Sequence, residues 1–152
     1  RSLDAWVDTP GLSEVFVGLN DLHLSLGCAF MFEPLASGLV DRVSARVHSQ
    51  GLRFGFGGIA RLNEGLVPGR DVLAEHVRLG SQAVILSRTF HHPSEQNAAA
   101  HGFDDEVAAL RQAERDLSKR TSQQVESDRS RIRGLIESVA TSMVRRSAEG
   151  MA

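Results

Sequence analysis

The sequence predicts an α/β protein built on a parallel sheet and followed by a helical tail. Short runs rich in Val, Ile and Phe alternate with segments whose apolar residues recur at helical spacing. The links between these segments are short, and such alternation is typical of parallel strands connected by helices. The pattern changes after Pro93, so we expect two parts, a strand-containing segment at 1–103 and a helical tail at 104–152.

Three strands are expected, at 14–19, 52–59 and 83–90. Their sequences are EVFVGL, LRFGFGGI and AVILSRTF, in which β-branched and aromatic residues favour an extended backbone. Each run is short and lies next to glycine or polar turn residues, which fits the length of strands in globular domains.

Two helices are expected between these strands. The first covers 35–49, because Leu35, Leu39, Val43 and Val47 recur every four residues and share one helix face. Gly51 then has the position of a helix-ending glycine. The second covers 70–79 and ends before Gly80.

The tail is expected to be mostly helical, because from Asp104 to Glu149 it contains no proline and only one glycine, Gly134. Its apolar positions form a narrow stripe that widens toward the end of the chain. The stripe consists of Leu110, Leu117, Val125 and Ile132, at intervals of seven or eight residues. A stripe of this kind indicates a helix that covers another apolar surface.

Composition limits the classes of partner. The net charge of −2 over 152 residues gives no basic excess for nucleic acid, and no apolar run is long enough to span a membrane. The first ten residues lack the pattern of a signal peptide. The single cysteine, Cys28, allows no intrachain disulfide and no zinc pattern. We therefore expect a cytoplasmic protein that binds a small molecule.

Polar and glycine residues lie where each predicted strand ends, which is where parallel α/β sheets bind ligands. Glycine lets a ligand approach the backbone closely, and arginine offers a planar fork to a carboxylate or phosphate. An aspartate in the same place suits a hard cation such as Mg²⁺. The candidate site consists of Asn20, Asp21, Gly57, Gly58, Arg61 and Arg88. This set favours a small anion bound beside a divalent ion.

Each of these residues also has a structural interpretation. Asp21 follows a strand, and an aspartate in that position is more often a helix N-cap than a metal ligand. Gly57 and Gly58 are equally suited to close packing, and an arginine after a strand commonly forms a surface ion pair.

The histidines give no metal pattern, because none has a partner at metal-binding spacing. His23 is close enough to Asp21 in sequence to line the site. His48 and His76 are expected to be partly exposed on helices, and His91 and His92 to lie in a loop. Cys28 is expected to be a small buried apolar residue.

Five ordered blocks of sequence carry a family resemblance. They are GLNDLHL, MFEPLA, GFGGIARLNEG, AEHVRLGS and ILSRTF, and they extend over about 14–90. These blocks resemble the HpcH/HpaI aldolase and citrate lyase β-subunit superfamily of metal-dependent keto-acid aldolases. They are most similar to a subgroup found near surface-polysaccharide genes.

The resemblance implies a TIM-type (β/α)₈ barrel, of which the three strands are about the sixth to the eighth. It implies that Asp21 binds Mg²⁺ or Mn²⁺ together with an upstream glutamate. The implied activity is a carbon–carbon lyase reaction of the aldolase type on a pyruvate-like keto acid, in which the ion stabilises an enolate. The chain is then the C-terminal half of such an enzyme.

The chain also departs from this family. It contains three of the eight strands, and the upstream glutamate and the arginine and histidine of early strands are absent. We therefore expect a homo-oligomer or a missing N-terminal half that completes the barrel, with the tail packed against either. Two alternatives remain, a non-catalytic structural or interaction module and another phosphate-binding barrel enzyme.

Overall fold

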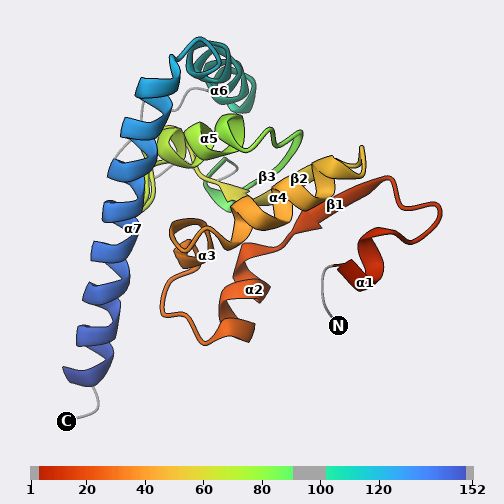
Figure 1. Cartoon of the computed structure of the whole chain (residues 1–152). Coiled ribbons are helices and arrows are strands. Elements are labelled where there is room, and N and C mark those ends of the chain that lie inside the picture. The colour runs from red at the N-terminus through yellow and green to blue at the C-terminus, as the bar shows by residue number, and fades with distance from the viewer. Residues whose placement is uncertain (1–3, 91–101, 150–152) are drawn as a thin grey trace.

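The computed structural model describes residues 4–90 and 102–149, and Figure 1 shows a mixed α/β fold with a small sheet and a helical tail. The elements, in chain order, are α1 (Asp4–Val7), β1 (Glu14–Val17), α2 (Leu19–Leu26), α3 (Glu33–Ala36), α4 (Leu39–Ser49), β2 (Arg53–Ile59), α5 (Gly69–Arg78), β3 (Ala83–Leu86), the 3-10 turn η1 (Arg88–Phe90), α6 (Phe103–Leu117) and α7 (Ser122–Glu149). The predicted α/β class with a parallel sheet and a helical tail is confirmed.

The sheet has three parallel strands in the order β1-β2-β3. Val17 near the end of β1 pairs with Phe56 of β2, and Ile59 at the end of β2 pairs with Leu86 at the end of β3. Because the strands are parallel, their carboxyl ends meet at one edge of the sheet, as the sequence predicted. We call this the carboxyl edge.

One face of the sheet is covered by α4 and α5. Phe54 and Phe56 alternate along β2 and therefore point to the same face, where both are fully buried. The ring of His48 on α4 meets Phe54 edge-on with centroids 5.8 Å apart, and that of His76 on α5 stacks on Phe56 at 3.8 Å. Since each helix packs on one of these phenylalanines, α4 and α5 lie on the same side of the sheet.

The opposite face carries small and exposed apolar residues. A Cβ atom at Gly55 would lie only 2.7 Å from the Phe16 ring and 2.9 Å from the Ala83 methyl group, so these three residues pack side by side. Ile85 lies on the same face as Ala83, two residues along β3. Phe16 is 36% exposed and Ile85 is 60% exposed. The described residues therefore leave this surface, which we call the open face, largely uncovered.

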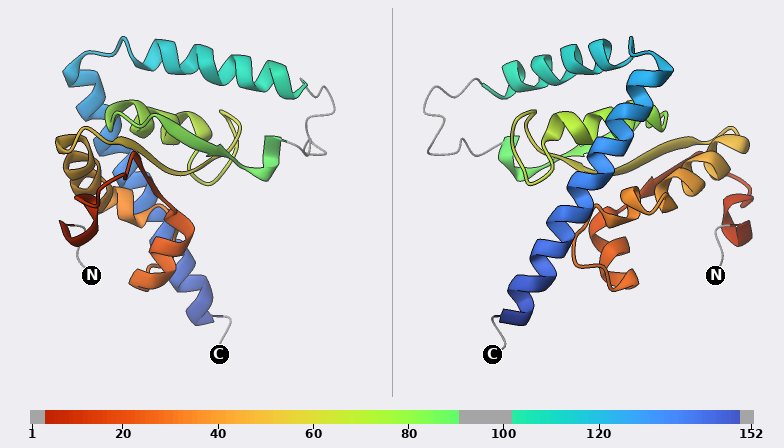
Figure 2. Two further views of the ribbon diagram at one scale, coloured as in Figure 1. Left: turned by 90° about the vertical axis from the view of Figure 1, so that its right-hand side faces the viewer. Right: turned by 60° about the vertical axis from the view of Figure 1, so that its left-hand side comes forward.

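The tail packs on its own chain. Figure 2 shows α6 lying above α5 while α7 runs past the body toward the C-terminus, and α7 also contacts α3 and α5. Leu110, Leu117 and Ile132 of the predicted stripe are buried in the same core as the sheet residues. The surface that this stripe covers thus belongs to this chain, so the stripe does not in itself require another subunit.

Arginine–carboxylate ion pairs connect the helices that pack outside the sheet. Arg78 of α5 donates hydrogen bonds to Glu75 at 2.6–3.1 Å and to Asp41 of α4 at 2.7 and 3.2 Å. Arg131 of α7 makes a two-bond contact with Asp71 of α5 at 2.7 and 2.8 Å. Two-bond contacts of this kind fix both distance and orientation. We call Arg78 and Arg131 the arginine clamps.

Asp41 takes part in a charge network between three helices, because Arg129 of α7 also lies 3.1 Å from its carboxylate. Burial by itself acts to raise the pKa of Asp41, but the hydrogen bond from Arg78 and the charges of Arg78 and Arg129 outweigh it, so the pKa is lowered. The carboxylate is therefore held in its ionised form between α4, α5 and α7.

Several predicted boundaries need correction. The helix expected at 35–49 is divided into α3 and α4, because Gly38 takes a left-handed conformation with φ of 71°. The strand expected at 14–19 ends at Val17 and α2 begins at Leu19, while the one expected at 83–90 is replaced after Leu86 by η1. The predictions for β2 and α5 agree with the structure to within one residue. In the described part of the chain, no helix combines the length and apolarity needed to cross a membrane.

Candidate functional site

The end of β1 leads directly into a helix. Gly18 is the N-cap of α2, so Asn20 and Asp21 lie in the first helical turn, and both are exposed. Asp21 is therefore not the N-cap residue, and no side-chain capping hydrogen bond forms here. Its negative charge still suits the positive end of the helix dipole. Asp21 is thus a first-turn aspartate of α2 at the carboxyl edge.

The two predicted glycines of β2 have different surroundings. Gly57 has φ of 50°, and a Cβ atom there would lie 2.8 Å from Cδ1 of Leu19, so this position serves backbone geometry and packing. At Gly58 the nearest atom to such a Cβ is the Ile85 carbonyl oxygen at 3.5 Å, an ordinary contact. Of the two, Gly58 is the one with room for a close approach to the backbone.

A tight turn after β2 fixes the position of Arg61. The Glu64 amide donates to the Arg61 carbonyl and the Gly69 amide donates to the Glu64 carbonyl, each at 3.0 Å. Gly69 begins α5 directly against the strand end, because a Cβ there would lie 2.3 Å from the Ala60 oxygen and 2.5 Å from the Arg61 oxygen. Only glycine permits this approach. The close contact and the two hydrogen bonds hold Arg61 and Glu64 in one turn.

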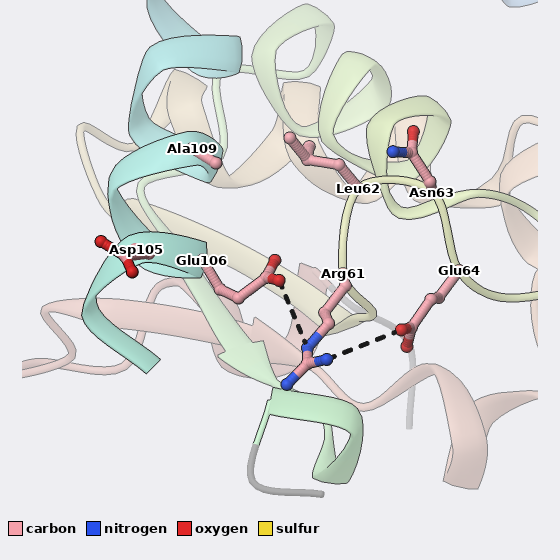
Figure 3. A pocket seen from close by; sticks show the side chains of 7 residues that line it. All are labelled: Arg61, Leu62, Asn63, Glu64, Asp105, Glu106 and Ala109. Carbon is pink, nitrogen blue, oxygen red and sulfur yellow. Dashed lines mark ion pairs between the residues drawn. The ribbon is translucent and has the colours of Figure 1, made fainter. Parts of the chain in front are cut away.

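Arg61 lies in a cavity of about 440 Å³ between this turn and the first turns of α6 (Figure 3). The lining residues are Arg61, Leu62, Asn63, Glu64, Asp105, Glu106 and Ala109. The Arg61 residue is only 6% exposed, and its guanidinium lies between two carboxylates. We call this space the Arg61 cavity.

The contacts of Arg61 are long. Nε lies 3.8 Å from Oε1 of Glu106, and Nη1 lies 3.8 Å from Oε1 of Glu64. These are ion pairs beyond hydrogen-bond distance. Arg61 Nε and Glu64 Oε1 are both buried, and neither has a hydrogen-bond partner among the described residues. The cavity therefore holds one donor and one acceptor that are unsatisfied.

The charges of the Arg61 cavity do not make it a simple anion site. Glu64, Asp105 and Glu106 contribute three carboxylates against the one guanidinium of Arg61. Figure 3 shows Glu64 and Glu106 on either side of Arg61, whereas Asp105 points away from it. An anionic ligand must therefore compete with carboxylates that the chain itself supplies.

The other predicted site residues share the edge without joining this cavity. Arg88 lies exposed in η1, whose start is held by a hydrogen bond from the Ser87 amide to the Ile59 carbonyl at 2.9 Å. Within the described ranges, no hydrogen bond or ion pair connects Asp21 with Arg61 or Arg88. The structure thus brings the predicted residues to one edge of the sheet but places only Arg61 in the cavity.

The described residues do not complete a metal centre. Among residues 4–90 and 102–149, no three His, Cys, Asp or Glu side chains gather as a metal-binding group. Asp21 offers a single carboxylate, whereas Mg²⁺ requires six oxygen ligands, of which some are water. Asp21 therefore fits the role of one ligand, and the remaining protein ligands would have to come from elsewhere.

Sequence reasoning missed Glu64 and Glu106. Glu64 follows Arg61 by three residues, and this spacing is a signal that a search for ion pairs would have found. Glu106 carried no such signal, because it belongs to the tail and reaches Arg61 only through the packing of α6. No local pattern predicts a contact of that kind.

His76 corrects the expectation of partial exposure. It is 4% exposed because its ring stacks on Phe56, and this burial lowers its pKa to about 3. Its Nδ1 lies 2.8 Å from the hydroxyl of Ser81, which donates to the Ala83 carbonyl, so Nδ1 carries the proton. His76 is a neutral core residue on the helix-covered face.

The remaining predicted residues have local roles. His23 is half-buried, with Nδ1 3.3 Å from the Leu19 carbonyl of its own helix. His48 contacts the Leu79 carbonyl through Nε2 at 3.1 Å. Cys28 is half-buried rather than buried, and partial burial and the nearby Glu33 charge raise the pKa of its thiol. The predictions for His91 and His92 lie outside the described residues.

Comparison with protein-family models, with curated proteins and with solved structures finds no match for this chain. The resemblance to metal-dependent aldolases therefore stays a prediction from the five sequence blocks, and the arguments for function below come from the residues and the geometry.

Proposed function

We propose that this chain forms the C-terminal part of a (β/α)-barrel carbon–carbon lyase of the aldolase type, which acts on a pyruvate-like keto acid. The observation that carries the proposal is the strand order β1-β2-β3 with α4 and α5 on one face. Doubly wound α/β folds place helices on both faces of the sheet, whereas a barrel keeps them all outside.

The open face supports the same architecture. The interior of such a barrel is filled by side chains of its strands, with bulky branched residues prominent. Phe16 and Ile85 point to the face without helices and remain partly exposed in the described residues. Further strands beside β1 and β3 would pair the exposed edges of the sheet and cover these side chains.

The proposed roles follow from the carboxyl edge. Asp21 would be one ligand of Mg²⁺ or Mn²⁺, and Gly58 would let the substrate approach the backbone. Asn20, Arg61 and Arg88 would hydrogen-bond the oxygens of the keto acid. Gly57, which the sequence grouped with them, would act by shaping the strand end. When bound, the ion would supply Lewis-acid stabilisation of an enolate.

The test uses the complete gene product that contains this chain, purified with Mg²⁺ or Mn²⁺ and supplied with aldol adducts of pyruvate. Release of pyruvate is followed by coupled oxidation of NADH. We expect release that depends on the divalent ion and is lost in Asp21→Asn, because the amide keeps the size of the carboxylate but not its charge. Asp104→Asn is the matched control, because Asp104 is also an exposed first-turn aspartate.

Two results would overturn the proposal. One is a complete gene product that releases no pyruvate from any adduct tested, which would favour a non-catalytic interaction module. The other is an Asp21→Asn variant with unchanged activity and unchanged Mn²⁺ binding in calorimetry, since Asp21 would then have no part in a metal site. Release of phosphate-bearing products alone would instead favour another phosphate-binding barrel enzyme.

A further inference from the structure

The guanidinium of Arg61 is buried without the hydrogen bonds that burial normally requires. Buried arginines are satisfied by several acceptors, because leaving a charged donor unpaired costs free energy. Arg61 instead has two contacts at 3.8 Å, and its Nε has no hydrogen-bond partner in the described part of the chain. The cavity beside it measures about 440 Å³, within the range of small-molecule pockets. This combination points to a ligand.

The unsatisfied atoms indicate the chemistry of that ligand. Nε of Arg61 requires an acceptor, and a carboxylate is the group whose geometry matches a guanidinium. Oε1 of Glu64 lacks a donor and lies 3.8 Å from the same guanidinium. A molecule that has a hydroxyl group next to a carboxylate provides both, the carboxylate for Arg61 and the hydroxyl for Glu64.

Glu106 marks where the carboxylate of such a ligand would bind. It approaches Nε from the first turn of α6, so the tail already places a carboxylate at this point (Figure 3). The distance of 3.8 Å leaves that contact weaker than a hydrogen-bonded ion pair. A free carboxylate, which is not tied to a helix, can move closer and form the hydrogen bond that Glu106 does not.

We infer that the Arg61 cavity is a binding site for a small α-hydroxy carboxylate, which displaces the Glu106 side chain from Arg61 and donates its hydroxyl proton to Glu64. This inference rests on the proposed function only in placing a ligand with a carboxylate beside Arg61 at the carboxyl edge. The negative charge of Glu106 opposes the ligand, so the first turn of α6 sets the affinity of the site. The tail then acts as a determinant of binding at the carboxyl edge.

The experiment titrates the full chain with glycolate and follows the Arg61 Nε–H resonance by NMR. Acetate is the matched probe, because it lacks only the hydroxyl group. We expect glycolate to shift this resonance and to bind more tightly than acetate. Glu106→Gln should tighten glycolate binding about tenfold, because it removes the negative charge that competes with the ligand for Arg61 Nε. Asp105→Asn removes an equal charge from the same cavity but points away from Arg61, so its effect should stay below about threefold.

The inference is overturned if glycolate leaves the Arg61 resonance unmoved in both the natural chain and Glu106→Gln. It is also overturned if Glu106→Gln and Asp105→Asn tighten binding equally, since the effect would then be one of general charge. Equal affinity for glycolate and acetate would reject the role of Glu64. If the complete protein binds glycolate at Arg61 but releases no pyruvate, this inference stands and the proposed lyase is rejected. If it releases pyruvate but glycolate does not shift the Arg61 resonance, the proposed lyase stands and this inference is rejected.

Discussion

Two arginines of this chain are buried to a similar degree but bonded in opposite ways. The side chain of Arg78 is 12% exposed and donates five hydrogen bonds to Glu75 and Asp41, at 2.6–3.2 Å. That of Arg61 is 7% exposed, and its two carboxylate partners remain at 3.8 Å. Both have carboxylates within reach, so the supply of partners does not explain the difference.

The difference lies in what holds the partners. Glu75 lies one helical turn before Arg78 on the same helix, and Asp41 lies on α4 alongside, so these carboxylates can close on the guanidinium. Glu64 belongs to a turn tied by backbone hydrogen bonds, and Glu106 to the first turn of α6. On the helix-covered side of the molecule, the buried guanidinium of Arg78 thus has its hydrogen bonds. At the carboxyl edge, the buried guanidinium of Arg61 lacks some of them. Unsatisfied groups of that kind are common where a fold serves a ligand.

The largest difference between the two regions is expected in the free energy of unfolding when Arg78 and Arg61 are each replaced. Arg78→Met leaves the nearly buried Glu75 unpaired and leaves Asp41 with Arg129 alone, so it should lower the free energy of unfolding by about 3 kcal/mol or more. Arg61→Met should lower it by about 1–2 kcal/mol, less than Arg78→Met, because the ion pairs that it removes are 3.8 Å long and the carboxylates of Glu64 and Glu106 keep some access to solvent. Urea denaturation of both variants measures this, and equal losses would show that Arg61 is a structural anchor like Arg78.

A smaller change in stability is expected when the pH is lowered, and its source is a residue on the helix-covered side. His76 has a pKa of about 3 in the fold against 6.5 as the ordinary value, so the unfolded chain takes up the proton first as pH falls. Its contribution to stability is therefore complete above pH 6.5 and is lost as pH falls toward 3. At about pH 5 the loss should be about 2 kcal/mol relative to neutral pH.

The measurement is the free energy of unfolding at the two pH values in the natural chain and in His76→Phe, which keeps a ring against Phe56 but does not titrate. The variant should have a correspondingly flatter pH dependence. His48→Gln serves as the control on α4, because His48 also contacts a core phenylalanine. If His76→Phe and the natural chain lose stability in parallel between these pH values, the buried imidazole is not the source of the effect.

Much of the sheet was predictable from the sequence, because it depends on local patterns. The runs that became β2 and α5 are bounded by Gly51 and Gly80, both of which have positive φ. The division of one predicted helix at Gly38 also depends on a local residue. It was missed because the apolar residues on both sides of Gly38 keep the spacing of a single helix. Strand ends were less predictable, because the helix that starts at Leu19 competes with the strand for the same residues.

The candidate site was predictable only in part. Position at the carboxyl edge followed from parallel strands, and this placed Asn20, Asp21, Gly58 and Arg88 at the ends of the strands. The Arg61 cavity did not follow from the sequence, because one of its walls is α6, which lies more than forty residues further along the chain. A contact such as that of Glu106 with Arg61 depends on how the tail folds back over α5, and no periodicity encodes that.

The smallest expected effect separates two adjacent glycines at the carboxyl edge. Gly57→Ala should lower the free energy of unfolding by about 1–2 kcal/mol, because the new methyl group meets Leu19 at 2.8 Å and the backbone has φ of 50°. Gly58→Ala should change it by less than about 0.5 kcal/mol, because its nearest contact is at 3.5 Å. Thermal unfolding of both variants gives the comparison.

The pair also tests which glycine belongs to the site. If Gly58 is kept free for a substrate, then Gly58→Val should weaken binding of a keto acid by the complete gene product while its melting temperature changes little. Gly57 offers no such separation, since its substitution disturbs the strand itself. A Gly58→Val protein with normal affinity and a large loss of melting temperature would place Gly58 with Gly57 as a packing residue. The carboxyl edge would then keep Asp21, Arg61 and Arg88 as its candidates for ligand binding, without a glycine that admits the ligand to the backbone.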